Sequence, residues 1–171
     1  MDISTITLIG MPGVGKSTVG VLLAKRLGLN FVDTDLLIQV REGETLQRTL
    51  EQRGYLALRD IEETVILEMP LSQSLISTGG SAVYSQSAME RLSSAGPIVY
   101  LRSTLPILEQ RVAKNPDRGI ASPPGVTLSD VFEERAPLYA QYGHYTVDCD
   151  ASAPEDIAST VMGMLASGGG A

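Results

Sequence analysis

The chain has 171 residues with a formal net charge of −7 at pH 7, and 43% of its residues are hydrophobic. This length predicts a single domain over residues 1–171, and the composition excludes disordered and fibrous classes. The acidic balance disfavours binding to nucleic acid or anionic membranes, and no apolar run reaches the roughly 18 residues of a membrane-spanning helix, so we expect a cytoplasmic protein.

The first half of the chain alternates short β-branched runs with apolar residues at helical spacing. These patterns predict strands at residues 3–9 and 30–33, and helices at 16–27, 36–53 and 55–68. Gly43 interrupts the second of these helices, and Thr45 can cap the piece that follows.

The second half continues the alternation. Strands are predicted at 74–77, 98–101 and 145–147, and helices from near Ser85, at 105–114, at 128–142 and at 154–165. Residues 115–125 hold three prolines and two glycines, which predicts a loop, and the glycine-rich residues 167–171 predict a flexible tail. The repeated order specifies a three-layer α/β/α domain with a five-stranded parallel sheet, whose ligands bind at the carboxyl ends of the strands.

Residues 10–17 read GMPGVGKS and match G-x-x-x-x-G-K-[ST] between the first strand and the first helix. In such a loop, backbone N–H groups surround phosphates, the lysine reaches the β- and γ-phosphates and the serine hydroxyl faces Mg²⁺. The alternative is a glycine-rich turn with an accidental Lys-Ser pair. The predicted nucleotide-binding residues are Gly10, Met11, Pro12, Gly13, Val14, Gly15, Lys16, Ser17 and Thr18.

A phosphate loop defines a superfamily rather than a reaction. The chain lacks the D-x-x-G and N-K-x-D motifs of GTPases, and it is too short for a motor or transporter ATPase. A small nucleoside triphosphate kinase with a small acceptor remains.

Two carboxylates, Asp33 and Asp35, follow the second predicted strand. Phosphoryl transfer uses one carboxylate near Mg²⁺ and another group that orients the attacking hydroxyl. The structural alternative is that Thr34 or Asp35 simply caps a helix beginning at Leu36.

Two arginines stand among acidic residues on predicted helices. Arg59 precedes Glu62 and Glu63 by three and four residues, and Arg135 directly follows two glutamates. This spacing is typical of ion pairs on solvated helix faces, so by themselves both arginines have a structural interpretation.

Six motifs nevertheless occur in a specific order: GMPGVGKST at 10–18, FVDTD at 31–35, LRDIE at 58–62, TGG at 78–80, VYLR at 99–102 and ERAPLY at 134–139. Over nearly the whole chain, they resemble the shikimate kinases, which are small P-loop NTPases with the nucleoside monophosphate kinase fold. The resemblance implies ATP and Mg²⁺ as cofactors, and a monomer with a mobile lid at about residues 115–125.

The resemblance also implies roles at the acceptor site. Asp35 would hold the acceptor hydroxyls and act as catalytic base or orienting group, while Asp33, with Ser17, would support Mg²⁺. Arg59 and Arg135 would bind the carboxylate of an anionic acceptor as forked donors. Backbone N–H groups of Gly79 and Gly80 would complete that pocket.

Three further residues are assigned a nucleotide contact by the resemblance. Arg118 in the lid would be catalytic, stabilising charge on the transferring phosphoryl group. Arg111 would lie beside adenine, and Pro154 would lie in the adenine-binding loop. The structural alternative for Arg118 is a solvated loop arginine.

The chain departs from the family pattern near the acceptor. Ser81 replaces a third glycine, Gly119 replaces the proline after the lid arginine, and Leu58 replaces a phenylalanine. The expected activity is ATP-dependent phosphorylation of the 3-hydroxyl of shikimate. The alternatives are a kinase for another hydroxy acid such as gluconate, and a nucleotide-binding protein without turnover; Asp35 and the short lid disfavour a nucleoside monophosphate kinase.

Overall fold

The computed structural model describes residues 4–114 and 119–168. These residues form five strands, seven α-helices and one short 3-10 helix, η1. In chain order they are β1 (Thr5–Ile9), α1 (Lys16–Leu27), β2 (Asn30–Asp33), α2 (Thr34–Glu42), α3 (Leu46–Glu68), β3 (Ser74–Ser77), η1 (Ala82–Tyr84), α4 (Gln86–Ala95), β4 (Ile98–Arg102), α5 (Leu105–Ala113), α6 (Leu128–Tyr142), β5 (Tyr145–Asp148) and α7 (Pro154–Ser167).

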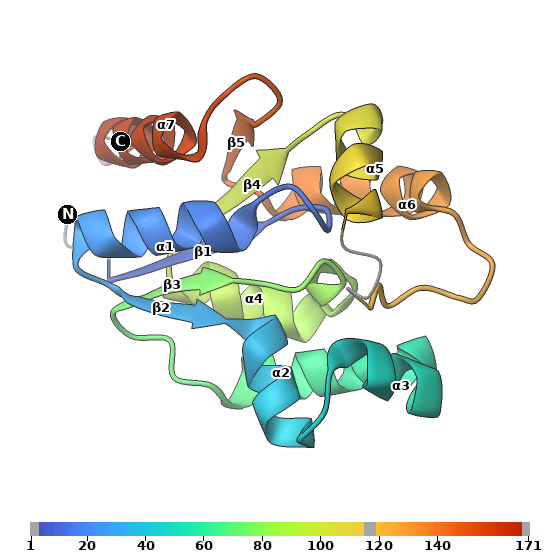
Figure 1. Cartoon of the computed structure of the whole chain (residues 1–171). Helices are drawn as coiled ribbons and strands as arrows, with labels where there is room; N and C mark the ends of the chain where they lie inside the picture. Colours follow the sequence, from blue (N-terminus) through green and yellow to red (C-terminus); the bar gives the residue numbers. More distant parts are fainter. Residues whose placement is uncertain (1–3, 115–118, 169–171) are drawn as a thin grey trace.

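The strands form one parallel sheet in the order β2-β3-β1-β4-β5, which confirms the predicted architecture. Their carboxyl ends all point to the same side, where the loop after β1, the start of α2 and the turn after β3 meet (Figure 1). Helices cover both faces of the sheet: α1 and α7 pack together on one, and α4 and α6 lie on the other.

The sheet is the centre of the main hydrophobic core because its middle strands are buried on both faces. Every residue of β1 and β3 is buried, and Ile6, Leu8, Leu75 and Ile76 are fully inaccessible to solvent. A second, smaller core joins α2 and α3 to Ala121, in the chain segment that precedes α6. That segment is thereby packed against the helices that follow β2.

Element boundaries differ from the predictions mainly at α2 and α3. Helix α2 begins at Thr34 and its cap is Asp33, whose side chain accepts from the N–H of Asp35 at 3.0 Å, so the prediction of Thr34 or Asp35 as cap of a helix starting at Leu36 was wrong. Thr45 caps α3 as predicted. Helix α3 is broken at Gly54, whose φ of 83° is outside the helical range, and this break confirms the predicted boundary between helices at 36–53 and 55–68.

Two smaller differences occur elsewhere. The 3-10 helix η1 was not predicted; it turns the chain between β3 and α4. Ser167, predicted to open the flexible tail, is the last residue of α7, and its hydroxyl donates to the carbonyl of Gly163. No helix within the described ranges is both long and apolar enough to cross a membrane.

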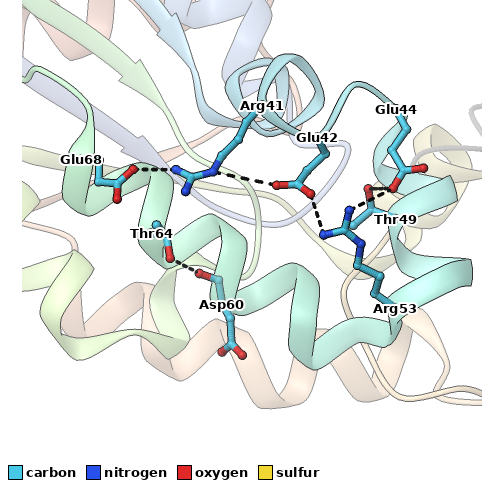
Figure 2. A network of polar contacts seen from close by, with 8 residues as sticks. All are labelled: Arg41, Glu42, Glu44, Thr49, Arg53, Asp60, Thr64 and Glu68. Carbon is cyan, nitrogen blue, oxygen red and sulfur yellow. Dashed lines mark hydrogen bonds and ion pairs between the residues drawn. The ribbon is translucent and has the colours of Figure 1, made fainter.

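A network of ion pairs fixes α2 on α3 (Figure 2). Arg41 Nη1 lies 2.6 Å from Glu68 Oε2, and Arg53 Nη1 lies 2.6 Å from Glu42 Oε2. These bonds connect the end of α2 to both halves of the broken helix α3. They stabilise the part of the fold that presents Asp35 to the site.

Candidate active site

The loop between β1 and α1 has the backbone of a phosphate-binding loop. Gly10, Gly13 and Gly15 have φ values of 146°, 85° and 104°, which residues with side chains rarely adopt. A Cβ at Gly10 would also collide with the carbonyl oxygen of Leu101. The loop ends at the N-terminus of α1, where free N–H groups and the helix dipole attract anions.

A cationic pocket opens at this loop. It is lined by Gly13, Gly15, Lys16, Ser17, Thr18, Arg111 and Lys114. The buried Lys16 side chain donates from Nζ to the carbonyls of Gly10 and Met11 at 2.7 and 3.0 Å. Arg111 donates from α5 to the carbonyl of Val14 at 3.1 Å. Three cations on one pocket suit a polyphosphate, whose charges they balance.

Several residues predicted to contact the nucleotide do not line the cationic pocket. Met11 and Val14 are buried in the core, and Pro12 lines the neighbouring pocket instead. Pro154 is the first residue of α7 and is not in the lining of the cationic pocket. Arg118 lies outside the described residues. Lys114 was missed, although it stands one turn beyond Arg111 on the same predicted helix.

Ser17 and Asp33 lie together beside the phosphate loop. The Ser17 hydroxyl donates to Asp33 Oδ2 at 2.6 Å, and it lies 3.4 Å from the hydroxyl of Ser77. The other oxygen of Asp33, Oδ1, caps α2. A hydroxyl and a carboxylate are the hard oxygen ligands that Mg²⁺ prefers, so these residues fit the predicted metal site.

A second pocket lies between Asp35 and Arg135. It is lined by Pro12, Asp35, Ile38, Leu46, Leu58, Glu62, Gly79, Gly80, Ser81, Gly119, Ile120, Ala121 and Arg135. The structure thus brings the predicted residues of α2, the turn after β3 and α6 around one hollow. We name it the acceptor pocket.

The two arginines predicted to bind a carboxylate meet at one oxygen atom. Arg59 Nη2 and Arg135 Nη2 donate to the carbonyl of Ala121 at 3.1 and 2.7 Å. Tyr84 lies under both guanidinium groups, with the Arg59 carbon 3.7 Å from its ring centre. Arg135 is 1% exposed, so its interpretation as part of a solvated helix face was wrong.

Glu62 belongs to the acceptor pocket, although its spacing from Arg59 suggested a surface ion pair. It is 3% exposed, and burial together with the charge of Asp35 raises its pKa to about 7. One signal in the sequence could have located it: Glu62 falls on the helix face of Leu58 and Val65, which is otherwise apolar and buried.

The glycines after β3 allow close approach of the polar groups. A Cβ at Gly79 would collide with Glu62 Oε1 and lie 2.7 Å from Asp35 Oδ1, and a Cβ at Gly80 would lie 2.9 Å from Arg135 Nη1. The N–H of Gly79 already donates to the Thr34 hydroxyl at 2.9 Å. The absence of a side chain at these two positions is therefore what makes room for the pocket.

The site as a whole combines a cationic pocket suited to polyphosphate with the acceptor pocket, and the two adjoin at the phosphate loop, where Gly13 lines the first and Pro12 the second. A P-loop fold with this pair of pockets defines a small-molecule kinase, a phosphotransferase that acts on a hydroxyl group. Comparison with known proteins specifies the family. The family model for shikimate kinase matches residues 12–166, and the chain belongs to that family.

Individual relatives agree with this family. Shikimate kinase 1 of Yersinia enterocolitica is 36% identical over 166 residues, covering 95% of this chain and 96% of the relative. A structure of shikimate kinase from Acinetobacter baumannii in complex with shikimate is 30% identical, with a TM-score of 0.89 over 97% of this chain and 94% of that one. A gluconokinase from Sinorhizobium meliloti, 18% identical with a TM-score of 0.54 over 96% and 93% of the two chains, shares only the fold.

Proposed function

We propose that the chain transfers the γ-phosphoryl group of ATP to the 3-hydroxyl of shikimate, giving shikimate 3-phosphate and ADP for aromatic amino acid biosynthesis. The observation that carries this proposal is the convergence of Arg59 and Arg135 on a single oxygen in the pocket that Asp35 lines. Two fixed guanidinium groups with five donors each suit a planar carboxylate. An acceptor with one carboxylate and several hydroxyls fits this combination.

On binding, the acceptor carboxylate replaces the Ala121 carbonyl as partner of the two guanidinium groups. The exchange substitutes an anion for a neutral oxygen, and charge-assisted hydrogen bonds are roughly twice as strong as neutral ones. The cation–π contacts with Tyr84 keep the Arg59 guanidinium in place during the exchange.

Asp35 orients the attacking hydroxyl and takes its proton. It stands in the first turn of α2, where the Asp33 cap and the ion pairs with α3 fix the helix. Because phosphoryl transfer depends mainly on position and charge stabilisation, a rigid carboxylate at this point is the chemical contribution required of the acceptor side.

The nucleotide side neutralises the charge of the transferring group. Lys16 turns from the carbonyls of Gly10 and Met11 to the β- and γ-phosphates, and Arg111 stays at the phosphate loop. Ser17 and Asp33 would hold Mg²⁺, which supplies further positive charge at the phosphates. Arg118 is proposed to reach the same phosphates, as the resemblance implies.

We further propose a cytoplasmic monomer with one domain; the single five-stranded sheet that the described residues form supports the one domain. Its net charge of −7 also favours a small ligand recognised by local arginines over a polyanionic partner.

The test is acceptor-dependent release of ADP from Mg-ATP with shikimate, gluconate, a nucleoside monophosphate panel and no acceptor. We expect release with shikimate alone. Release with gluconate and not shikimate would transfer the assignment to another hydroxy acid. ATP binding without turnover of any acceptor would contradict a kinase and favour a nucleotide-binding role.

A further inference from the structure

Ser81 lines the acceptor pocket but directs its hydroxyl at the protein. It is 7% exposed, and its hydroxyl donates to Oε2 of Glu62, which is 3% exposed. This buried bond joins the turn after β3 to the second half of α3. The hydroxyl group therefore acts on a carboxylate within the pocket.

The second oxygen of the Glu62 carboxylate, unlike the first, accepts no hydrogen bond from the described residues. Oε1 of Glu62 is buried and has no hydrogen-bond partner among the residues that the structure describes. A Cβ at Gly79 would touch both this atom and Oδ1 of Asp35, so the two oxygens border the same space above Gly79 in the pocket. A buried acceptor without a donor is unfavourable, and a ligand hydroxyl placed there would satisfy it.

Charged groups of three other elements face Glu62. Asp35 of α2 raises its pKa, while Arg135 of α6 and Lys16 of α1 lower it. Burial raises the pKa most, and the hydrogen bond from Ser81 lowers it. The net result is a carboxylate whose charge changes near neutral pH, with Ser81 favouring the ionised form.

We propose that Ser81 is a positioning residue for the acceptor: by donating to Oε2 it holds the Glu62 carboxylate with Oε1 toward the pocket, where Oε1 receives a hydroxyl of a polyhydroxylated carboxylic acid. The choice of ligand rests on the proposed function, whereas the link between Ser81 and Glu62 does not. Glu62 must be ionised to accept from the ligand and from Ser81 together. Binding of the acceptor is therefore strongest when Glu62 carries no proton.

The experiment compares Ser81→Ala and Ser81→Gly with the unsubstituted chain across pH 5.5 to 9. Removing the hydroxyl frees the carboxylate to rotate and removes a bond to its charged form. We expect the KM for shikimate to rise about 5- to 30-fold with the KM for ATP unchanged, and the acidic limb of kcat/KM to move to higher pH. Ser81→Thr, which keeps the hydroxyl, should restore the limb.

A matched control is available at the neighbouring glutamate of α3, whose donor lies on α4. Ser87 donates to Oε1 of Glu63 at 2.5 Å, an exposed bond between the same residue types. Ser87→Ala should leave both KM values and the pH limb unchanged. Melting curves of every variant identify any loss of folding, and Ser81→Gly, which restores the glycine of the family pattern, serves if Ser81→Ala does not fold.

Two results would overturn the proposal: an unmoved pH limb in Ser81→Ala and Ser81→Gly, or equal changes in the KM of both substrates. An NMR titration of the Glu62 carboxyl carbon measures the pKa of Glu62 directly, without turnover, in the unsubstituted chain and in the Ser81 variants. If the unsubstituted chain turns over no shikimate while this titration still shifts with Ser81, the proposed function fails and the link stands. If the pKa of Glu62 is the same with and without the Ser81 hydroxyl, the proposed link between Ser81 and Glu62 fails.

Discussion

The phosphate loop and the acceptor pocket lie at the same edge of the sheet but are built in opposite ways. The loop is one contiguous segment, residues 10–17, whose shape depends on glycine backbones. The acceptor pocket takes side chains from α2, α3 and α6 and from the turn after β3. A local segment can be specified by local sequence, whereas the pocket exists only when distant elements pack together.

The two regions also differ in how their polar groups are engaged. Lys16 donates to carbonyls of its own loop, so the phosphate site needs only a rotation of one side chain. At the acceptor pocket, by contrast, Arg59 and Arg135 donate to the carbonyl of Ala121, which belongs to a different segment of the chain. The acceptor therefore competes with a part of the chain, and variants in the two regions should affect the two substrates differently.

The largest effect is expected at Lys16. In Lys16→Ala, the charge that stabilises the transferring phosphoryl group is lost, and kcat should fall by about 1000-fold or more. Steady-state assays with saturating ATP measure this, with the exposed Lys25→Ala as control. A rate near that of the unsubstituted chain would remove the loop from the mechanism.

The next largest effect concerns the two arginines that meet at the Ala121 carbonyl; Arg135 lines the acceptor pocket and Arg59 lines the pocket beside it. Arg59→Ala or Arg135→Ala should lower kcat/KM for the acceptor about 30- to 1000-fold, or about 2–4 kcal/mol, mainly through its KM. Arg135→Lys keeps the charge but not the fork and should stay impaired. The KM for ATP should change little, as should both constants in the exposed Arg48→Ala; equal changes for both substrates would contradict the carboxylate site.

A smaller effect of opposite sign is expected at Gly119. Its φ of 65° lets the segment before α6 pack closely on α3, because a Cβ there would lie 2.8 Å from the backbone nitrogen of Gln47. In Gly119→Ala the segment must shift, Ala121 releases the arginines more often, and the acceptor KM should fall about 3- to 10-fold.

Gly125 provides the control for this substitution. Its φ of 80° is equally strained for alanine, but no atom lies within 4 Å of the added Cβ. Gly125→Ala should leave the acceptor KM unchanged. An acceptor KM that rises in Gly119→Ala would show that the Ala121 contact does not compete with the acceptor.

The smallest effect is expected for the ion pairs between α2 and α3 (Figure 2). Arg53 is 46% exposed, so Arg53→Ala should lower stability by only about 0.5–1 kcal/mol and Tm by about 1–4 °C. The acceptor KM should change less than about 3-fold, because the α2 and α3 core remains. A KM change as large as that in Arg59→Ala would mean that this network positions Asp35 by itself.

Most of the fold could be predicted from the sequence because its signals are local. The phosphate loop, the five strands and the Thr45 cap each depend on residues close in sequence. The start of α2 could not be read in this way: Asp33, Thr34 and Asp35 are all good caps, and the choice depends on Asp33 also meeting Ser17.

The acceptor pocket was predictable only in part. Asp35, Arg59 and Arg135 were found through motifs of the family, whereas Glu62 was assigned to the surface because burial depends on packing between α3 and the turn after β3. The use of Ala121 as partner for both arginines follows from the path of a loop, which no spacing in the sequence indicates.

One carboxylate joins the two regions. Asp33 accepts a hydrogen bond from the Ser17 hydroxyl on Oδ2. Its other oxygen, Oδ1, caps α2 by accepting from the N–H of Asp35. A Mg²⁺ ion held by Ser17 and Asp33 would act on the same side chain that fixes the first turn of α2. Thermodynamic linkage makes such an effect reciprocal. If bound Mg-ATP raises the affinity for the acceptor by some factor, the bound acceptor raises the affinity for Mg-ATP by the same factor.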